Sequence, residues 1–423
     1  MPHVVLDRPY EFVPPHHGTW WPGVIQFFEL YRFYLSRKEG IVSRECRHVD
    51  RLTSSLRDGH GILLCPNHCR TADPIVMGWL ARAARTHVFA MASWHLFNEG
   101  RFKAFAIHKM GGFSINREGV DRKSIDTAID VVARAERPLI LFPEGATSRT
   151  NDHLHALLDG VAFIARTAAK RRAKNVADGR VVVHPVGIKY LYEGDLGHVA
   201  QETLSDIERQ LTWQPQDHLP LVARLTKVGS ALLALKEIEH LGAPQSGSVS
   251  ERITHLIEQL LVPLETEWLG APQSGGTIPR VKAVHMRILP EMTQQQLSST
   301  EKERRLRQLA TLQLAQQLGF YPADYVASRP TVDRILETLE RLEEDLTGRA
   351  RIYGSIRAVI EVDPPITVSP ERDRSAKVDP LMAELEARLQ ALVARLGLES
   401  PLYEDPALPP AATTPAAAAD SPA

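Results

Sequence analysis

Short apolar runs alternate with amphipathic stretches between residues 61 and 190. The runs are nearly all apolar, as strands covered on both faces should be, and the stretches between them have helical spacing. This alternation is typical of an α/β fold. It predicts strands at 62–65, 88–91, 139–142 and 181–188, and helices at 74–84, 122–135 and 154–170.

The second half of the chain carries mainly helical periodicity. Helices are predicted at 220–240, 249–269, 300–318, 331–347 and 380–396, and strands at 281–289 and 356–362. The heptapeptide LGAPQSG occurs twice, each time directly after a helical stretch. Two copies are too few for a solenoid, so we interpret them as a helix–loop duplication.

Aromatic residues are concentrated near the N-terminus. Residues 10–34 hold nine of them, a third of the chain's total, and a short helix is predicted after Pro22. Aromatic-rich amphipathic helices with basic ends lie at membrane interfaces. A helix packed on its own domain can carry the same stripe, so the pattern leaves both interpretations open.

Composition excludes several classes of protein. The chain has 423 residues, 43% hydrophobic and 24% charged, which argues against wholesale disorder, collagen and coiled coil. No apolar run reaches the ~18 residues of a membrane span, and the N-terminus does not resemble a secretory signal. Three cysteines are too few for a disulfide framework and indicate a reducing cytoplasm.

The overall charge of −1 hides an asymmetry, because residues 1–190 carry a balance of +9 and residues 191–423 a balance of −10. A basic half suits a phosphate-bearing substrate or an anionic membrane surface. A solvated basic face explains the same numbers.

A histidine follows one predicted strand at the edge where α/β sheets bind ligands. His68 lies on the turn after residues 61–66, and its imidazole can act as a general base near neutral pH. Asp73, five residues later, can fold back to fix the tautomer of His68 and stabilise its imidazolium. Taken alone, the pair is better explained by a helix-capping Asp73 and a surface histidine, and Asp73 could also do both jobs.

Two further segments could bind the polar head of a substrate. The turn after strand 139–142 combines a glycine, which permits close backbone approach, with two hydroxyls and a cation that suit a phosphate or a glycerol hydroxyl. A second cation, Arg117, follows a short strand. An ordinary loop and a solvated arginine are the simpler interpretations. The candidates in the turn are Glu144, Gly145, Thr147, Ser148 and Arg149.

Other chemistries lack their motifs. Neither the Gly-x-Ser-x-Gly turn of serine hydrolases nor a phosphate-binding P-loop occurs. Cys65, His68 and Cys69 include metal-ligand types, but no second cluster has zinc spacing. We therefore predict no metal.

These segments together resemble the glycerolipid acyltransferase family, which includes the 1-acyl-sn-glycerol-3-phosphate acyltransferases. Four blocks match in the family's order. They are Asn67, His68 and Asp73 of the Asn-His-four residues-Asp signature; Gly111, Phe113 and Arg117; Phe142 to Gly145; and Val183, Pro185, Val186 and Ile188. One position departs, since the third block usually continues Thr-Arg-Ser but here reads Ala146-Thr147-Ser148, with Arg149 following.

The resemblance implies transfer of a fatty acyl group from acyl-CoA or acyl carrier protein to a hydroxyl of a glycerophospholipid precursor such as 1-acyl-glycerol-3-phosphate. His68 would be the general base, oriented by Asp73, and the acceptor oxygen would attack the thioester directly. Arg117 and the 144–149 turn would hold the acceptor head, and Pro185 would lie near the donor. Another lysolipid acceptor, or a catalytically silent membrane protein of the same fold, are the alternatives.

The resemblance also implies an organisation and a location. We expect a mixed sheet flanked by helices with a mainly helical insertion, no cofactor, no nucleic-acid partner, and a peripheral position on the cytoplasmic face of a membrane. The expected segments are a membrane-docking segment (1–50), an acyltransferase core (51–194), the insertion (195–350), the closing strand and helix of the core (351–398) and a disordered Pro/Ala-rich tail (399–423).

Overall fold

A mixed eight-stranded sheet lies at the centre of the computed structural model, which describes residues 10–116, 121–294, 297–372, 375–376 and 378–405. The strand order is β1-β7-β6-β2-β5-β3-β4, with β8 paired to β6. Strand β6 runs parallel to β2 and antiparallel to β7 and β8. The strands are β1 (Ile41–Arg47), β2 (Gly61–Pro66), β3 (Phe89–Ser93), β4 (Gly112–Ile115), β5 (Leu139–Ile140), β6 (Val181–Tyr192), β7 (Ile356–Val362) and β8 (Ile366–Thr367).

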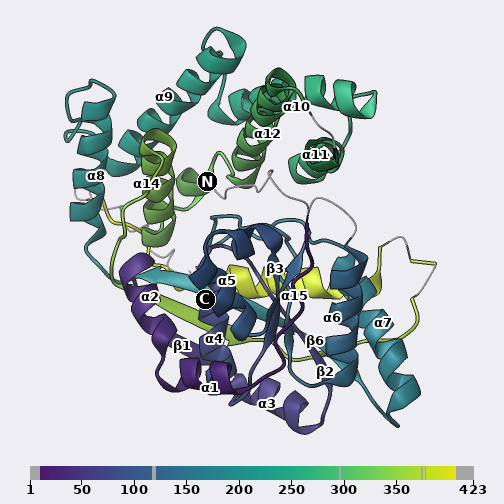
Figure 1. Cartoon of the computed structure of the whole chain (residues 1–423). Coiled ribbons are helices and arrows are strands. Elements are labelled where there is room, and N and C mark those ends of the chain that lie inside the picture. Colours follow the sequence, from purple (N-terminus) through teal and green to yellow (C-terminus); the bar gives the residue numbers. More distant parts are fainter. Residues whose placement is uncertain (1–9, 117–120, 295–296, 373–374, 377, 406–423) are drawn as a thin grey trace, which may run out of the picture.

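Helices cover both faces of this sheet (Figure 1). Side chains that alternate along β2 and β6 enter two separate hydrophobic clusters, as expected for a sheet buried on both sides. The mixed α/β fold and the predicted core strands are therefore confirmed. The surrounding helices are α3 (Val49–Arg57), α4 (Asp73–Ala83), α6 (Arg122–Arg134), α7 (Gly160–Asn175) and α15 (Pro380–Gly397). Of the helices predicted here, α7 deviates most, because it begins at Gly160 instead of residue 154.

The insertion forms a group of helices at one end of the sheet, at the top of Figure 1. Its predicted helices are confirmed, but the strand predicted at 281–289 is wrong. That run belongs to a helix, and Val281, Val284 and Ile288 are spaced to share one helical face, buried against two neighbouring helices. The helices are α8 (Leu196–Gln210), α9 (Leu221–Leu241), α10 (Val249–Leu269), α11 (Thr277–Gln294), α12 (Ser299–Phe320), α13 (Tyr325–Ser328) and α14 (Val332–Thr347).

The two LGAPQSG copies form equivalent helix-to-helix loops. In each copy a glycine with positive φ follows the helix, a buried glutamate accepts a backbone hydrogen bond across the loop, and an arginine of the next helix pairs with that glutamate. The helix–loop duplication is therefore confirmed, with a structural role for the repeat. The corresponding residues are Gly242, Glu237, Gln245 and Arg252 in the first copy, and Gly270, Glu265, Gln273 and Arg280 in the second.

The N-terminal segment forms two helices, α1 (Trp20–Phe27) and α2 (Leu30–Lys38), instead of the single predicted helix. They are separated at Glu29, which has a φ of 49°. Tyr31 and Leu35 pack into the core, whereas large aromatic side chains on the other side stay exposed. Across the described ranges, every helix is too short or too polar to cross a membrane.

The predicted C-terminal tail begins within ordered structure. Leu402 pairs with Thr331, and the Tyr403 amide donates to the Pro330 carbonyl, so residues 399–405 pack beside the start of α14. The rest of the predicted tail, 406–423, lies outside the described residues.

Candidate active site

His68 is held on the turn between β2 and α4, at the carboxyl edge of the parallel strands. The preceding Asn67 fixes this turn to β6: its Oδ1 accepts from the Ile188 amide at 2.7 Å, and its Nδ2 donates to the Ile188 carbonyl at 3.0 Å. His68 Nδ1 then meets Asp73 Oδ2, at the start of α4, at 2.8 Å. The structure thus brings the predicted base and its predicted carboxylate partner together.

Asp73 is fully buried and has three polar donors around its carboxylate. Besides His68, the Arg70 amide donates to Oδ2 at 2.9 Å and the Tyr190 hydroxyl donates to Oδ1 at 2.5 Å. Burial raises the pKa of Tyr190 well above its usual value, so this hydroxyl keeps its proton and acts as a donor. Tyr190 was not among the predicted site residues. Tyr190 lies two residues after Ile188 along β6, so the two side chains share one face of the strand, and this spacing is the signal that could have found it.

The turn after β5 encloses the other side of the His68 ring. Phe142 stacks on the imidazole with 4.1 Å between ring centroids, and Thr147 Oγ1 lies 3.2 Å from Nε2. Ser148 donates twice to the His68 carbonyl, from its amide at 2.8 Å and from its hydroxyl at 3.2 Å. Thr147 therefore contacts His68 Nε2, the ring nitrogen that does not face Asp73, whereas Ser148 holds the backbone of His68.

Glu144 and Gly145 shape this turn. The Glu144 carboxylate accepts from the His68 amide at 2.7 Å and from the His155 amide at 3.0 Å. Burial raises its pKa to about 7. Gly145 has a φ of 72°, and a Cβ there would lie 2.4 Å from a side-chain carbon of Leu158. In this arrangement Glu144 supports His68 through the backbone.

Helix α14 of the insertion covers the cationic side of the site. Arg149 pairs with Glu344, and Arg70 pairs with Glu340 at 2.8 Å. Arg149 keeps about half of its side chain exposed, at 51%. Of the other predicted residues, Arg117 lies outside the described residues, and Pro185 lies opposite Cys65 in the β2–β6 pairing.

A second contact joins α14 to β6 beside the dyad. Glu337 is buried; it accepts from the Asn151 amide at 3.2 Å and from the Tyr325 hydroxyl at 2.7 Å. The Asn151 side chain bonds both backbone polar groups of Tyr190, at 2.6 and 3.0 Å. The cavity left here, about 10 Å³, holds at most one water. Sequence reasoning missed these contacts because α14 lies far along the chain.

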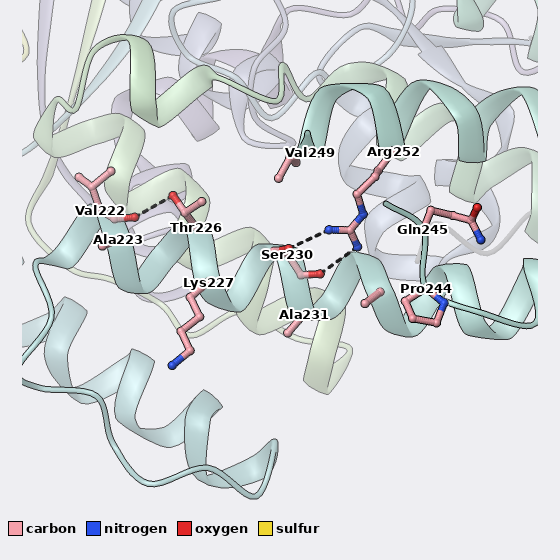
Figure 2. A pocket seen from close by; sticks show the side chains of 11 residues that line it. Val222, Ala223, Thr226, Lys227, Ser230, Ala231, Pro244, Gln245, Val249 and Arg252 are labelled. Carbon is pink, nitrogen blue, oxygen red and sulfur yellow. Dashed lines mark hydrogen bonds between the residues drawn. The ribbon is translucent and has the colours of Figure 1, made fainter. Parts of the chain in front are cut away.

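A groove of about 860 Å³ lies elsewhere, in the insertion (Figure 2). It runs between α9 and α10, where Arg252 reaches Ser230 at 2.8 Å. It is lined by Val222, Ala223, Thr226, Lys227, Ser230, Ala231, Ala234, Pro244, Gln245, Val249 and Arg252, none of which belongs to the predicted site. Within the described ranges, no group of three or more His, Cys, Asp or Glu side chains could hold a metal ion.

Comparison with known proteins finds an acyltransferase segment. Residues 44–189 match the family model described as Acyltransferase, and this segment contains His68, Asp73 and the turn after β5. A similar protein is the 1-acyl-sn-glycerol-3-phosphate acyltransferase of Streptococcus pneumoniae (strain ATCC BAA-255 / R6), which is 32% identical over 115 residues. The alignment covers 27% of this chain and 40% of the relative's length.

Proposed function

We propose that this protein transfers a fatty acyl group from an acyl thioester, carried by CoA or acyl carrier protein, to a hydroxyl of a glycerophospholipid precursor such as 1-acyl-glycerol-3-phosphate. The observation that carries this proposal is the His68–Asp73 pair at the strand edge, inside the segment that matches the family. The name of the S. pneumoniae relative supports the acceptor class.

The geometry suits His68 to act as a general base through Nε2. Its Nδ1 donates to the buried Asp73 carboxylate, which fixes the tautomer and stabilises the imidazolium that forms. The imidazole takes the proton of the attacking hydroxyl, whose oxygen bonds to the thioester carbonyl carbon. The carbon–sulfur bond then breaks, and the thiolate leaves with the proton that His68 held. This chemistry uses no cofactor and no metal.

The acceptor head would bind where the 142–149 turn meets α14. Arg149 is partly exposed there and can bind an anionic group, which would replace Glu344 as the partner of the guanidinium. That same pairing favours a second acceptor class, a lysolipid with a neutral head, because Arg149 already has a carboxylate partner.

An aromatic surface supports docking to a membrane from the cytoplasmic side. Phe27, the last residue of α1, and Phe28, its C-cap, are mostly exposed. Phe102 of α5 (Arg101–Lys109) is 85% exposed. Trp21 contacts Phe105 edge-on at 5.3 Å, which joins α1 and α5 into one surface. Basic residues at the end of α2 and along α5 suit an anionic lipid surface.

Release of free thiol that depends on an acceptor lipid tests the proposal. The purified protein is incubated with acyl-CoA or acyl carrier protein and a panel containing 1-acyl-glycerol-3-phosphate and neutral-head lysolipids. His68→Ala should lower transfer ~10²–10⁴-fold while the folded state survives, because the Arg70 amide and the Tyr190 hydroxyl still bond the buried Asp73 carboxylate. Absence of acceptor-dependent turnover with every donor and acceptor would refute the proposal and favour a catalytically silent protein.

A further inference from the structure

We propose that the groove between α9 and α10 binds a fatty acid, with the carboxylate on Arg252 and the alkyl chain along α9. The groove belongs to the insertion, outside the segment that matches the family model. The inference does not depend on the proposed acyl transfer, because binding needs no turnover. It begins with three helix junctions that repeat within the insertion, α8–α9, α9–α10 and α10–α11.

The three junctions are built in the same way. In each, a buried glutamate near the end of the first helix accepts the backbone amide of a loop glutamine, and a buried arginine of the second helix pairs with that glutamate. The three arginines therefore occupy equivalent positions, and their surroundings can be compared directly. The pairs are Arg224 with Glu208, Arg252 with Glu237, and Arg280 with Glu265.

Two of these arginines contact a second carboxylate. Nη1 of Arg224 lies 3.1 Å from Oδ1 of Asp217. Arg280 donates to both carboxylate oxygens of Glu258, with 3.0 Å between Nη2 and Oε2. The side chains of Asp217 and Glu258 are 65% and 45% exposed, so the second carboxylate lies on the solvent side of the buried pair.

Arg252 has a serine in that place. Ser230 precedes Arg252 by 22 residues, as Glu258 precedes Arg280. The Ser230 hydroxyl accepts from Nη1 of Arg252 at 2.8 Å, and the Ser230 carbonyl accepts from Nη2 at 3.3 Å (Figure 2). With the two bonds to Glu237, these contacts use four of the five guanidinium N–H groups. Among the described residues, Arg252 thus has one carboxylate partner where its two counterparts have two.

The charge of the groove favours an anionic ligand. The charged residues that line it, Lys227 and Arg252, are both cations, and Nζ of Lys227 bonds the neutral Oε1 of Gln216 at 2.9 Å. A carboxylate suits the place of Ser230, because Glu258 shows that the next copy of this arginine binds both oxygens of a carboxylate at once. Planar guanidinium and carboxylate groups match in this way.

The wall along α9 suits an alkyl chain. Its side chains are small or apolar and recur at helical spacing, so they share one face of the helix. From Ser230 back to Val222 this face extends for about 12 Å. A ligand with a single carboxylate at one end of an unbranched chain therefore matches both the cation and the wall. The α9 residues of the wall are Val222, Ala223, Thr226, Ala231 and Ala234.

The test measures binding of labelled decanoate to the full-length chain by equilibrium dialysis, below the concentration at which decanoate forms micelles. We expect about one decanoate per chain. Along the series hexanoate, octanoate and decanoate, each added methylene should tighten binding about two- to fourfold. Decanol lacks the carboxylate and should bind at least ~tenfold more weakly than decanoate.

Variants separate the anion site from the alkyl wall. Ser230→Glu supplies the carboxylate that Glu258 supplies in the next junction, so it should fold and weaken decanoate binding at least ~tenfold. Ser299→Glu, at the exposed start of α12, controls for the added charge and should bind like the unaltered chain. Ala231→Gln should weaken decanoate more than hexanoate. Melting temperatures check that each variant is folded.

A decanoate with a terminal diazirine locates the bound chain by photolabelling. The label should fall on tryptic peptides 228–236 and 237–252, which hold part of the α9 wall and Arg252. The proposed active site could also take an acyl chain, and label at that site would appear within residues 61–192 instead.

Several results would overturn the proposal. These are label confined to residues 61–192, equal affinity for hexanoate and decanoate, equal affinity for decanol and decanoate, and unchanged binding in a folded Ser230→Glu chain. If Ser230→Glu does not fold, the photolabel and Ala231→Gln still decide. Thiol release plays no part in these measurements, so its absence would refute the proposed function alone.

Discussion

Replacing Tyr190 by Phe removes one donor from the Asp73 carboxylate and leaves the ring in place. The Tyr190 hydroxyl lies 2.5 Å from Asp73 Oδ1, and both residues are buried. The remaining donors, His68 Nδ1 and the Arg70 amide, both bond to Oδ2. In Tyr190→Phe, Oδ1 would be left with the Cys69 thiol, a weak donor that lies 3.9 Å away.

The size of the effect follows from these contacts. A hydrogen bond to a charged group contributes about 1.5–3 kcal/mol, and each 1.4 kcal/mol is tenfold in rate. A loss of positioning of that size lowers kcat by up to about tenfold to a hundredfold, which is less than removal of the base.

The assay is acceptor-dependent thiol release across a pH range, with Tyr192→Phe as the matched control. Tyr192 lies two residues along β6, on the same face, and its amide bonds Asp333. We expect a lower kcat and a nearly unchanged KM for both substrates in Tyr190→Phe alone. A wild-type kcat in Tyr190→Phe would show that Tyr190 is only a packing residue.

Three further perturbations probe the cation, the buried acid and the aromatic surface. Arg149→Ala should raise the acceptor KM about tenfold and leave the donor KM unchanged, whereas Glu344→Gln should lower the acceptor KM because a competing carboxylate is removed; steady-state kinetics measure both. Burial raises the pKa of Glu337 to about 8 from its ordinary value of 4.5. The free energy of unfolding should therefore fall as the pH rises from about 4.5 to about 8, because ionising the buried carboxyl destabilises the folded state. In thermal melts, Glu337→Gln should flatten that decline. Phe27→Ser should weaken flotation with anionic vesicles about tenfold, and Phe163→Ser, an equally apolar exposed site on α7, should not.

Periodicity predicted most of the core because burial on both faces leaves a clear trace in the sequence. Strand β6 is mostly apolar between Val181 and Ile188 and is buried throughout. The error at 281–289 has a different origin. Val281, Val284 and Ile288 recur at helical spacing and are separated by polar residues, so the pattern favours an amphipathic helix, and the strand prediction gave too much weight to the β-branched side chains.

The motifs predicted the local part of the site and missed the distant part. His68 and Asp73 lie within one motif, and Glu144 follows a neighbouring predicted strand, so the sequence placed all three at one edge of the sheet, and the structure brings them together. Tyr190 follows from strand spacing only once the pairing of β6 with β2 is known. Glu337 reaches Asn151 through the docking of α14, and no spacing rule in a single sequence predicts that contact.

The meeting of α14 with the core also gives the charge asymmetry of the sequence a structural meaning. Residues 1–190 are net basic and residues 191–423 net acidic, and at this interface cations of the first part meet carboxylates of the second. Arg70 pairs with Glu340, Arg149 with Glu344, and Lys189 with Asp333. Under the proposed function, an anionic acceptor would have to compete with Glu340 and Glu344 for Arg70 and Arg149. The insertion, which lies outside the segment that matches the family model, would then influence which acceptor the proposed site takes.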